Sequence, residues 1–350
     1  MKTQFQYKLL KEIDLEDHFF DSLRQDYDGF DAWYRRKADE GKWAFVLYGD
    51  QGLQAFIFIK SEINELVDDI EPPIAPCRLL KVGTLKIEAH QTKLGERALK
   101  IIFDQALSYH FEKIYLTTFP KHAQLIQLLE AYGFQMYGRK NDEVVLIKMM
   151  NSSTGDIKLD YPRFSLDRRA FLLSVKPEYH TRLFPDSILN NEQAHSKELI
   201  QDCSHTNSIR KIYISWNKEV TTLKRGDLLA IYRMSDQQAP ALYRSVVTSI
   251  CTVTSVLDKS HWHSCEDFLK DVYPYSVFSK EELIHFYGRQ NFYVIHMLYN
   301  CALPDRITRK SLIEEAGMDG QLRWGFLPLA NEQFKYILSK GNVSKGFIID

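Results

Sequence analysis

The chain has 350 residues, of which 45% are hydrophobic and 13% aromatic, which suffices for packed cores and excludes an extensively disordered protein. Its length favours two domains over one. The formal net charge of −1 excludes a strongly basic or acidic protein, but the charge is uneven. Residues 1–160 contain 21 basic and 25 acidic residues, whereas residues 161–350 contain 24 and 21. This balance permits a nucleic-acid partner for the second half without requiring one.

Cysteine usage and hydropathy indicate the compartment. The cysteines are odd in number and widely spaced, so they do not form a disulfide framework. There is no signal-peptide pattern before residue 20, and no apolar run reaches the ~18 residues that a membrane span needs. We therefore expect a soluble, cytoplasmic protein with no membrane partner. The five cysteines are Cys77, Cys203, Cys251, Cys265 and Cys301.

The first 60 residues predict one strand, two helices and a hairpin. Residues 6–13 alternate weakly and favour a strand, and apolar side chains around Phe20 and Trp33 favour two short helices. Two apolar runs at residues 43–48 and 53–59 flank a turn rich in glycine, which is typical of a β-hairpin.

Residues 79–134 predict a βαβα unit. A strand at 79–87 is followed by a short polar turn and a helix whose apolar residues recur every three or four positions. A second apolar run at 113–119 leads into another amphipathic helix, which Gly133 ends. Such short spacings favour a parallel strand pair. Residues 134–147 then predict a second hairpin.

The turn before the first of these helices has the chemistry of an anion site. A helix N-terminus leaves backbone N–H groups without intrahelical partners and carries about half a positive charge. Lys93 adds a full charge there, and Gly95 lets the backbone approach a ligand closely. A pyrophosphate is the natural occupant, although many helices start after a turn that contains glycine.

Residues 1–150, with the glycine-bearing turn and the Tyr132-Gly133-Phe134 segment, resemble the GNAT (GCN5-related) N-acetyltransferase fold. The resemblance implies a mixed sheet with flanking helices and an acetyl-coenzyme A site between the fourth and fifth strands. It implies a backbone that pairs with the pantetheine arm and a turn that holds the pyrophosphate. The cofactor-binding residues so implied are Thr84, Leu85, Lys86, Ile87, His90, Lys93, Leu94, Gly95 and Glu96.

The chain departs from the family pattern in its turn and its catalytic positions. Of the six turn positions from His90 to Gly95, only the last matches the family's Gln/Arg-x-x-Gly-x-Gly/Ala. The family's frequent Asn after strand five falls on His122, and its usual acid Tyr falls on Leu129. By position, Glu88 is the best general base.

The catalytic candidates are therefore Glu88, His122 and Tyr132. Each also has a structural interpretation: Glu88 as a solvated strand end, His122 as a helix cap, and Tyr132 as part of the core.

A polar linker at residues 151–160 separates this half from residues 161–350, where many short strands alternate with few helices. That pattern predicts a small, partly open β-barrel. The segment 226–232, the strand after it at 246–253 and the closing segment 329–338 resemble the PUA-like superfamily with its ASCH and EVE domains. The ASCH signature Gly-x-Lys-x-x-Glu-x-Arg is absent, so an amidohydrolase role is not supported.

The PUA-like resemblance implies recognition of RNA or a modified base by stacking and basic side chains. The alternative is that the aromatic candidates belong to the core and the cations to a solvated turn. The candidates are Trp216, Lys224, Arg225, Tyr232 and Arg233.

Two clusters of histidine and cysteine, at residues 203–205 and 261–265, have spacings that fit no common zinc pattern, so we expect no metal.

These observations predict an α/β (α+β) protein whose first domain transfers an acetyl group from acetyl-coenzyme A to an amine. A PUA-like domain would recruit RNA, such as a tRNA, or an RNA-associated acceptor. The alternative is a non-catalytic binding or regulatory module that only holds coenzyme A or a partner. A toxin–antitoxin or defence component is a third hypothesis.

Overall fold

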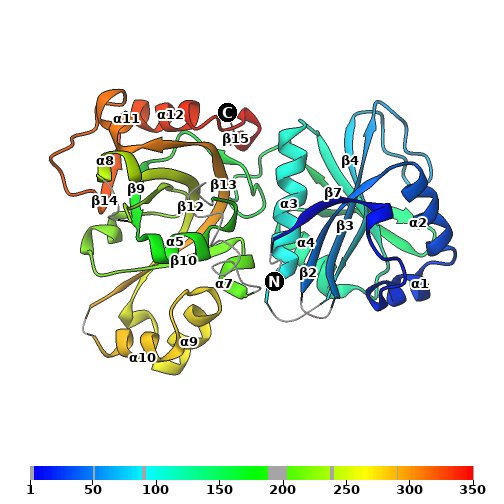
Figure 1. Ribbon diagram of the computed structural model, residues 1–350, viewed down its shortest axis with the longest axis horizontal. Helices are drawn as coiled ribbons and strands as arrows, with labels where there is room; N and C mark the ends of the chain where they lie inside the picture. Colours follow the sequence, from blue (N-terminus) through cyan, green and yellow to red (C-terminus); the bar gives the residue numbers. More distant parts are fainter. Residues whose placement is uncertain are drawn as a thin grey trace. The chain divides into compact units, whose positions relative to one another are not determined.

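The computed structural model describes residues 4–49, 52–88, 92–187, 203–236, 240–289 and 291–349. The chain divides after Ser152 into two compact units, here called unit 1 (up to Ser152) and unit 2 (from Ser153). Figure 1 colours them from blue to cyan and from green to red. Both combine helices with mixed sheets, so the general α+β class is confirmed.

Unit 1 contains a seven-stranded sheet in the order β1-β2-β3-β4-β5-β7-β6. Every neighbouring pair is antiparallel except β4–β5, which is parallel. Both predicted hairpins are present, as β2–β3 and β6–β7. The strands are β1 (Gln6–Leu9), β2 (Trp43–Gly49), β3 (Gly52–Ile63), β4 (Arg78–Ile87), β5 (Lys113–Thr118), β6 (Gln135–Lys140) and β7 (Glu143–Met149).

Helices cover both faces of this sheet. Figure 1 shows α3 and α4 on one face and α1 and α2 on the other. In α3 the periodic residues Leu99, Ile102 and Phe103 are buried, as the helical spacing predicts. On the opposite face, rings such as Phe20 and Phe56 pack edge to face with centroids 5.3 Å apart. The helices are α1 (Asp21–Asp26), α2 (Phe30–Asp39), α3 (Leu94–Ser108) and α4 (Ala123–Ala131).

The parallel pair β4–β5 separates halfway along β4. Its register runs from Leu79↔Lys113 to Val82↔Leu116 and stops there, although β4 continues to Ile87. At this point β4 has one extra residue against β3, because Phe58 pairs with Thr84 and Ile59 with Val82, which leaves Gly83 as a bulge. A bulge bends its strand and increases the local twist, which explains why β4 leaves β5 here.

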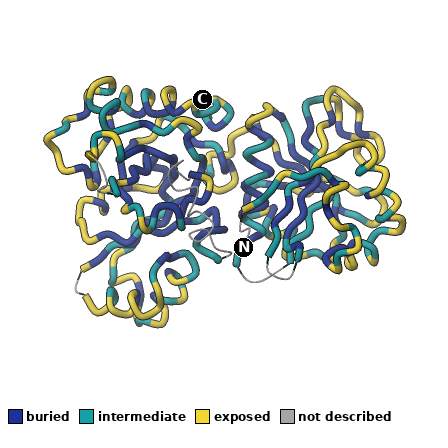
Figure 2. The backbone as a smooth tube through the Cα atoms, viewed as in Figure 1, coloured by how far each residue is buried: buried dark blue, intermediate teal, exposed yellow. Residues whose placement is uncertain are grey.

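Unit 2 contains a six-stranded sheet in the order β10-β13-β12-β11-β9-β14 and a two-stranded sheet of β15 and β8. The long strands β12 and β13 run through its buried interior (Figure 2). The strands are β8 (Phe164–Ser165), β9 (Ala170–Val175), β10 (Arg210–Ser215), β11 (Leu228–Arg233), β12 (Val246–Asp258), β13 (Tyr293–Thr308), β14 (Phe326–Leu329) and β15 (Ile348–Ile349).

The sequence predicts a partly open barrel, and the described strands of unit 2 form a sheet that does not close. Among the described residues no hydrogen-bonded ladder joins the two edge strands, β10 and β14. One physical reason lies in β14, which has four residues and contains Pro328, whose nitrogen cannot donate to a further strand. Helices pack around the open sheet instead. They are α5 (Pro177–Leu183), α7 (Ser204–Asn207), α8 (Ala241–Arg244), α9 (Cys265–Val272), α10 (Lys280–Gly288), α11 (Arg309–Glu314) and α12 (Asn331–Lys340).

The polar segment that the sequence predicts as a linker is organised by Asp160, which is buried. Its carboxylate accepts hydrogen bonds from the hydroxyls of Ser153 and Thr154 at 2.8 Å, and from the backbone N–H groups of Thr154 and Gly155. Residues 153–160 therefore form an ordered turn of unit 2.

Candidate active site

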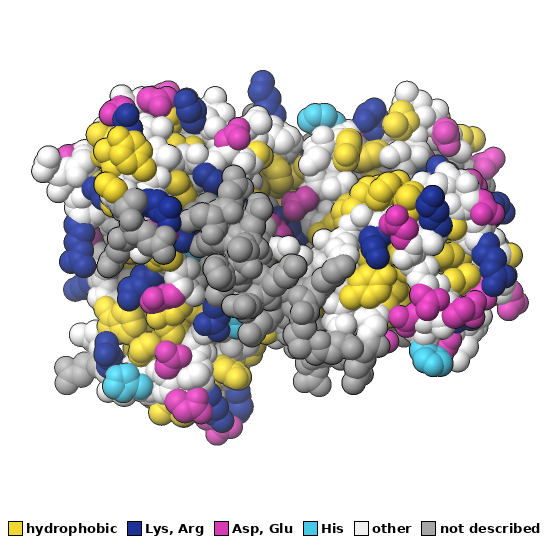
Figure 3. Space-filling view, in the orientation of Figure 1, with side chains coloured by type: hydrophobic (Ala, Val, Ile, Leu, Met, Phe, Trp, Pro, Cys, Tyr) yellow, Lys and Arg dark blue, Asp and Glu magenta, His cyan; other side chains and the backbone are white. Residues whose placement is uncertain are grey.

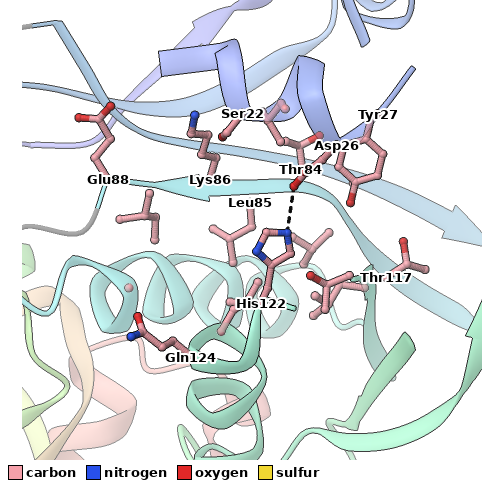
Figure 4. Close-up of a pocket in the computed structure, with 18 of the residues that line it drawn as sticks. Ser22, Asp26, Tyr27, Thr84, Leu85, Lys86, Glu88, Thr117, His122 and Gln124 are labelled. Atoms are coloured by element: carbon pink, nitrogen blue, oxygen red, sulfur yellow. Dashed lines mark hydrogen bonds and ion pairs between the residues drawn. The ribbon is translucent and has the colours of Figure 1, made fainter. Parts of the chain in front are cut away.

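A cavity of 1140 Å³ opens in unit 1 where β4 and β5 separate. Its walls come from β4, the end of β5, the first turns of α3 and α4, and the segment that joins α1 to α2 (Figure 4). The bulge at Gly83 lies in the wall, so the same residue bends β4 and lines the opening.

Strand β4 presents alternate side chains to the two sides of the cavity. Figure 4 shows Thr84, Lys86 and Glu88 directed toward α1, and Leu85 directed toward α4. Beyond Val82 this part of β4 pairs with β3 only. Its other backbone edge therefore has no strand partner among the described residues.

The predicted cofactor residues are brought together, with one exception. His90 lies outside the described residues. The others all line the cavity: Thr84, Leu85, Lys86, Ile87, Lys93, Leu94, Gly95 and Glu96.

The N-terminus of α3 forms one end of the cavity. The N-cap residue Lys93 has φ of +58° and makes no side-chain cap, so the first N–H groups of a 15-residue helix are not satisfied by that residue's side chain. A left-handed conformation is uncommon for a residue other than glycine. A Cβ at Gly95 would lie 3.0 Å from Leu128, so the absence of a side chain lets α3 approach α4 closely.

His122 and Asp26 form a hydrogen-bonded pair in the cavity wall. His122 is the N-cap residue of α4, and its Nε2 lies 3.1 Å from Oδ2 of Asp26 at the end of α1 (Figure 4). Lys121 contacts the other carboxylate oxygen. Burial raises the pKa of Asp26, but the hydrogen bond and charge of Lys121, together with the charge of His122, lower it by more. Asp26 is therefore a carboxylate that orients the imidazole.

A second hydrogen-bond network joins two cavity-lining residues, Tyr27 and Thr117, to Glu143. The hydroxyl of Tyr27 donates to Oε1 of Glu143 at 2.7 Å, and the hydroxyl of Thr117 donates to Oε2 at 2.9 Å. Burial, and then the hydrogen bond to Glu143, raise the pKa of Tyr27 above its ordinary value. Tyr27 therefore remains a protonated phenol at neutral pH.

Lys86 places a half-buried cation in the same wall. Its ammonium contacts the carbonyl of Phe19 and lies 4.6 Å from the centre of that residue's ring. Burial lowers the pKa of Lys86, while the carboxylates around it, led by Glu88, oppose the shift.

The other two catalytic candidates lie in different settings. Glu88 lines the cavity, and its backbone N–H donates to the carbonyl of Gln54 at 2.9 Å. In Figure 4 it lies at the other end of the cavity-lining part of β4 from Thr84, Asp26 and His122. Tyr132 is buried outside the cavity lining, and its hydroxyl lies 3.2 Å from Oε2 of Glu96.

Sequence reasoning missed Asp26, Tyr27 and Glu143. Asp26 and His122 are 96 residues apart, and Tyr27 and Glu143 are 116 apart, and no motif connects them. Only a weak signal in the sequence pointed to Asp26. This residue is the last of a short helix that contains a second aspartate, and a glycine follows the helix.

The structure does not bring the five nucleic-acid candidates of unit 2 together. Lys224 and Arg225 are exposed before β11 begins, whereas Tyr232 and Arg233 are buried at its other end. Trp216 is exposed and packs edge to face on Phe286. On the visible face of unit 2, acidic and basic side chains are interspersed (Figure 3).

No protein-family model and no curated protein matches this sequence. Solved structures do resemble it at low similarity. One is ASCH from Zymomonas mobilis, with 11% identity and a TM-score of 0.33, covering 49% of this chain and 96% of that chain. Another is a GNAT-family acetyltransferase from Listeria monocytogenes, with 14% identity and a TM-score of 0.32, covering 41% and 94%.

A third likeness is to the NatC complex bound to Gag peptide and CoA, with 17% identity and a TM-score of 0.29, covering 42% of this chain and 98% of that chain. Each of these three likenesses covers less than half of this chain.

None of the described helices is long and apolar enough to cross a bilayer. Within the same part of the chain, no three histidine, cysteine, aspartate or glutamate side chains gather closely enough to hold a metal ion.

Proposed function

We propose that unit 1 binds acetyl-coenzyme A in this cavity and transfers its acetyl group to an amine. The observation that carries the proposal is the separation of β4 from β5 after Val82. It leaves backbone N–H and C=O groups of β4 facing a cavity that ends at the N-terminus of α3. An extended ligand that carries both amides and phosphates matches these two surfaces.

The cofactor would be held largely by backbone groups. Residues Thr84 to Ile87 offer an unpaired strand edge to the two amides of a pantetheine arm. The first N–H groups of α3, with the charge of Lys93, offer a seat for the pyrophosphate. Because backbone groups and one cation suffice, the divergent sequence of the turn is compatible with this role.

His122 is the base that the geometry favours. Its Nε2 is engaged with Asp26, which leaves Nδ1 to accept a proton from an amine as the amine nitrogen bonds to the thioester carbonyl carbon. The carbon–sulfur bond then breaks and coenzyme A leaves as the thiol, with the proton returned to sulfur. A carboxylate on one imidazole nitrogen fixes the tautomer that makes the other nitrogen basic. Glu88 remains the second candidate for this role.

The acceptor is an amine, and recruitment of RNA or of an RNA-associated acceptor by unit 2 remains a prediction. Trp216 is exposed, and the guanidinium carbon of Arg289 lies 5.4 Å from the centre of its ring. Of the predicted set, Trp216 is the residue best placed for stacking on a base.

Calorimetric titration of acetyl-coenzyme A tests the first step. We expect binding by the wild type and loss of binding in Gly95→Trp, since its side chain would meet Leu128 and fill the space between α3 and α4. Gly288→Trp is the matched control, because a Cβ at Gly288 meets no atom within 4 Å. If the wild type gives no heat, the transferase proposal fails and the non-catalytic alternative remains.

A further inference from the structure

Unit 2 has a defect in its sheet at Thr248. Along β11–β12 the register passes from Ile231↔Ser249 to Tyr232↔Val247, and along β12–β13 it passes from Ser249↔Ala302 to Val247↔Ile307. Thr248 therefore has no register partner in either neighbouring strand, β11 or β13. Residues 303–306 of β13 likewise have no partner in β12. Such bulges redirect side chains and are frequent beside binding sites.

A fully buried histidine faces this defect. His180 of α5 is 0% exposed, and its Nε2 lies 2.7 Å from the hydroxyl of Thr248. Its Nδ1 is buried and has no hydrogen-bond partner among the described residues. A buried polar atom without a partner is rare in folded proteins and calls for a missing ligand, ion or water.

The charges of two arginines lower the pKa of the same histidine. Arg306 comes from the unpaired part of β13, and its Nε and Nη1 are buried without hydrogen-bond partners among the described residues. Its Nη2 lies 3.5 Å from the carbonyl oxygen of Asp186, in an exposed position. Arg233, at the end of β11, is 2% exposed. Burial and then the charges of Arg233 and Arg306 lower the pKa of His180 to about 3, so the imidazole is neutral.

Hydroxyl groups complete the cluster. The hydroxyl of Ser187, in a 3-10 turn (Pro185–Ser187), lies 2.7 Å from that of Ser249 and 3.0 Å from that of Tyr299. The carboxylates that act on Arg306, those of Asp186 and Asp305, belong to exposed residues. The buried side of the cluster is thus rich in N–H and O–H donors.

We propose that His180, Arg233, Arg306 and Ser187 form a binding site for a phosphate group in unit 2. Guanidinium groups bind phosphate through paired N–H groups. Two nitrogens of Arg306, Nε and Nη1, are buried and have no hydrogen-bond partner among the described residues. The phosphate could belong to a small molecule or to the end of a nucleic acid, which share this chemistry. The site is independent of the function proposed for unit 1.

Binding of inorganic phosphate to the full chain tests the site, measured by calorimetry at constant ionic strength with chloride as the replaced anion. We expect Arg306→Gln to weaken binding at least tenfold, and Arg306→Lys, which keeps the charge but not the planar fork, to weaken it several-fold. Arg168→Gln is the control because Arg168 is an exposed arginine of the same unit, and it should leave binding unchanged.

The turn at Lys93 is a second place where phosphate could bind, so Lys93→Gln is measured in parallel. The part of phosphate binding that is lost in Arg306→Gln should persist in Lys93→Gln. Absence of phosphate binding in the wild type, which needs no variant to fold, would overturn the proposal. Equal binding by wild type and a folded Arg306→Gln protein would do the same.

Competition identifies the source of the phosphate. A short RNA with a 5′-phosphate and the same RNA with a 5′-hydroxyl are each added against inorganic phosphate. Displacement by the 5′-phosphorylated RNA alone assigns the site to nucleic-acid ends. Displacement by neither assigns it to a small phosphorylated molecule. Equal displacement by both RNAs shows that the site does not select a terminal phosphate and counts against the proposal.

Discussion

At the scale of single residues, the acetyl transfer that we propose for unit 1 depends on which side chain takes the proton from the acceptor amine. Position along the sequence favours Glu88, whereas the folded chain gives His122 an oriented imidazole beside Asp26. A general base typically contributes ~10²–10⁴ in rate, so the two candidates are separable by kinetics.

We expect His122→Gln to lower kcat by roughly 100-fold with little change in the KM for acetyl-coenzyme A, since the histidine acts on the acceptor. Asp26→Asn should lower kcat less, by about tenfold, because it removes the orienting carboxylate and not the base. Glu88→Gln is the comparison and should change kcat less than about threefold. Release of thiol from acetyl-coenzyme A with simple primary amines is the measurement. A larger loss of kcat in Glu88→Gln than in His122→Gln would assign the role of general base to Glu88.

Three histidines with lowered pKa values should make the stability of unit 2 dependent on pH. Burial lowers the pKa values of His180 and His205 to about 3 and that of His296 to about 4, from 6.5. Each unfolded histidine binds a proton below pH ~6.5 that the folded one does not bind until a much lower pH. Their contribution to stability is therefore present above pH ~6.5 and is lost as the pH falls toward the folded values.

The expected effect for one such residue follows from linkage. Between about pH 7 and about pH 5, the free energy of unfolding should fall by about 2 kcal/mol more in the wild type than in His180→Gln. Urea denaturation at the two pH values, in buffer without phosphate, measures this difference. An identical decrease in both proteins would mean that His180 titrates normally in the fold.

At the scale of elements, the bulge at Gly83 connects the sequence to the cavity. A Cβ there would lie 2.9 Å from Cδ1 of Phe58, so a side chain would force the bulge to shift. The two strands separate at this residue, and a shift would alter the backbone edge that we assign to the cofactor.

Gly83→Ala should therefore weaken binding of acetyl-coenzyme A about tenfold and lower the free energy of unfolding by about 1 kcal/mol. Calorimetry and thermal denaturation provide the two values. Gly325→Ala is the control, since a Cβ at Gly325 meets nothing within 4 Å. Unchanged affinity in Gly83→Ala would show that the bulge does not shape the site.

A second glycine tests strand packing apart from the cavity. A Cβ at Gly138 of β6 would lie 2.0 Å from the carbonyl oxygen of Glu71, which is backbone and cannot rotate away. We expect Gly138→Ala to lower the free energy of unfolding by roughly 3 kcal/mol or more. The protein that remains folded should bind acetyl-coenzyme A normally, because Gly138 does not line the cavity. Thermal denaturation measures the stability, and calorimetry on the folded fraction measures the binding. Weaker binding in the folded variant would show that the packing of β6 affects the cavity.

At the scale of the whole molecule, each unit has hydrophobic clusters of its own. One cluster of unit 1 gathers residues from Leu10 to Phe58, and one cluster of unit 2 gathers residues from Phe171 to Phe326. Each of these two clusters draws its residues from a single unit. Independent cores are the mark of domains that fold separately.

A chain that ends at Ser152 should therefore fold cooperatively and bind acetyl-coenzyme A within about twofold of the full protein's affinity. Circular dichroism on heating and calorimetry are the measurements. Loss of binding in a folded truncated chain would mean that unit 2 supplies part of the site.

The sequence by itself determined the local elements of unit 1. Periods of two and of 3.6 residues, together with turns and caps, located the strand at 79–87, the helix from Leu94 and both hairpins of unit 1, because these signals act over a few residues. The helix N-terminus with Lys93 and Gly95 was evident for the same reason. The partly open barrel stays a prediction, because the arrangement of distant edge strands is not encoded in any local pattern.

Only the tertiary structure decided which side chains share a site. It paired Asp26 with His122 and Tyr27 with Glu143, and it gathered His180, Arg233 and Arg306 around one defect in a sheet. Contacts between residues about a hundred positions apart depend on how strands are ordered and where a ladder breaks. The ladder between β4 and β5 breaks in this way after Val82. Because the strands separate there, the turn at Lys93, which the sequence predicts to hold a phosphate, lies at the end of a cavity.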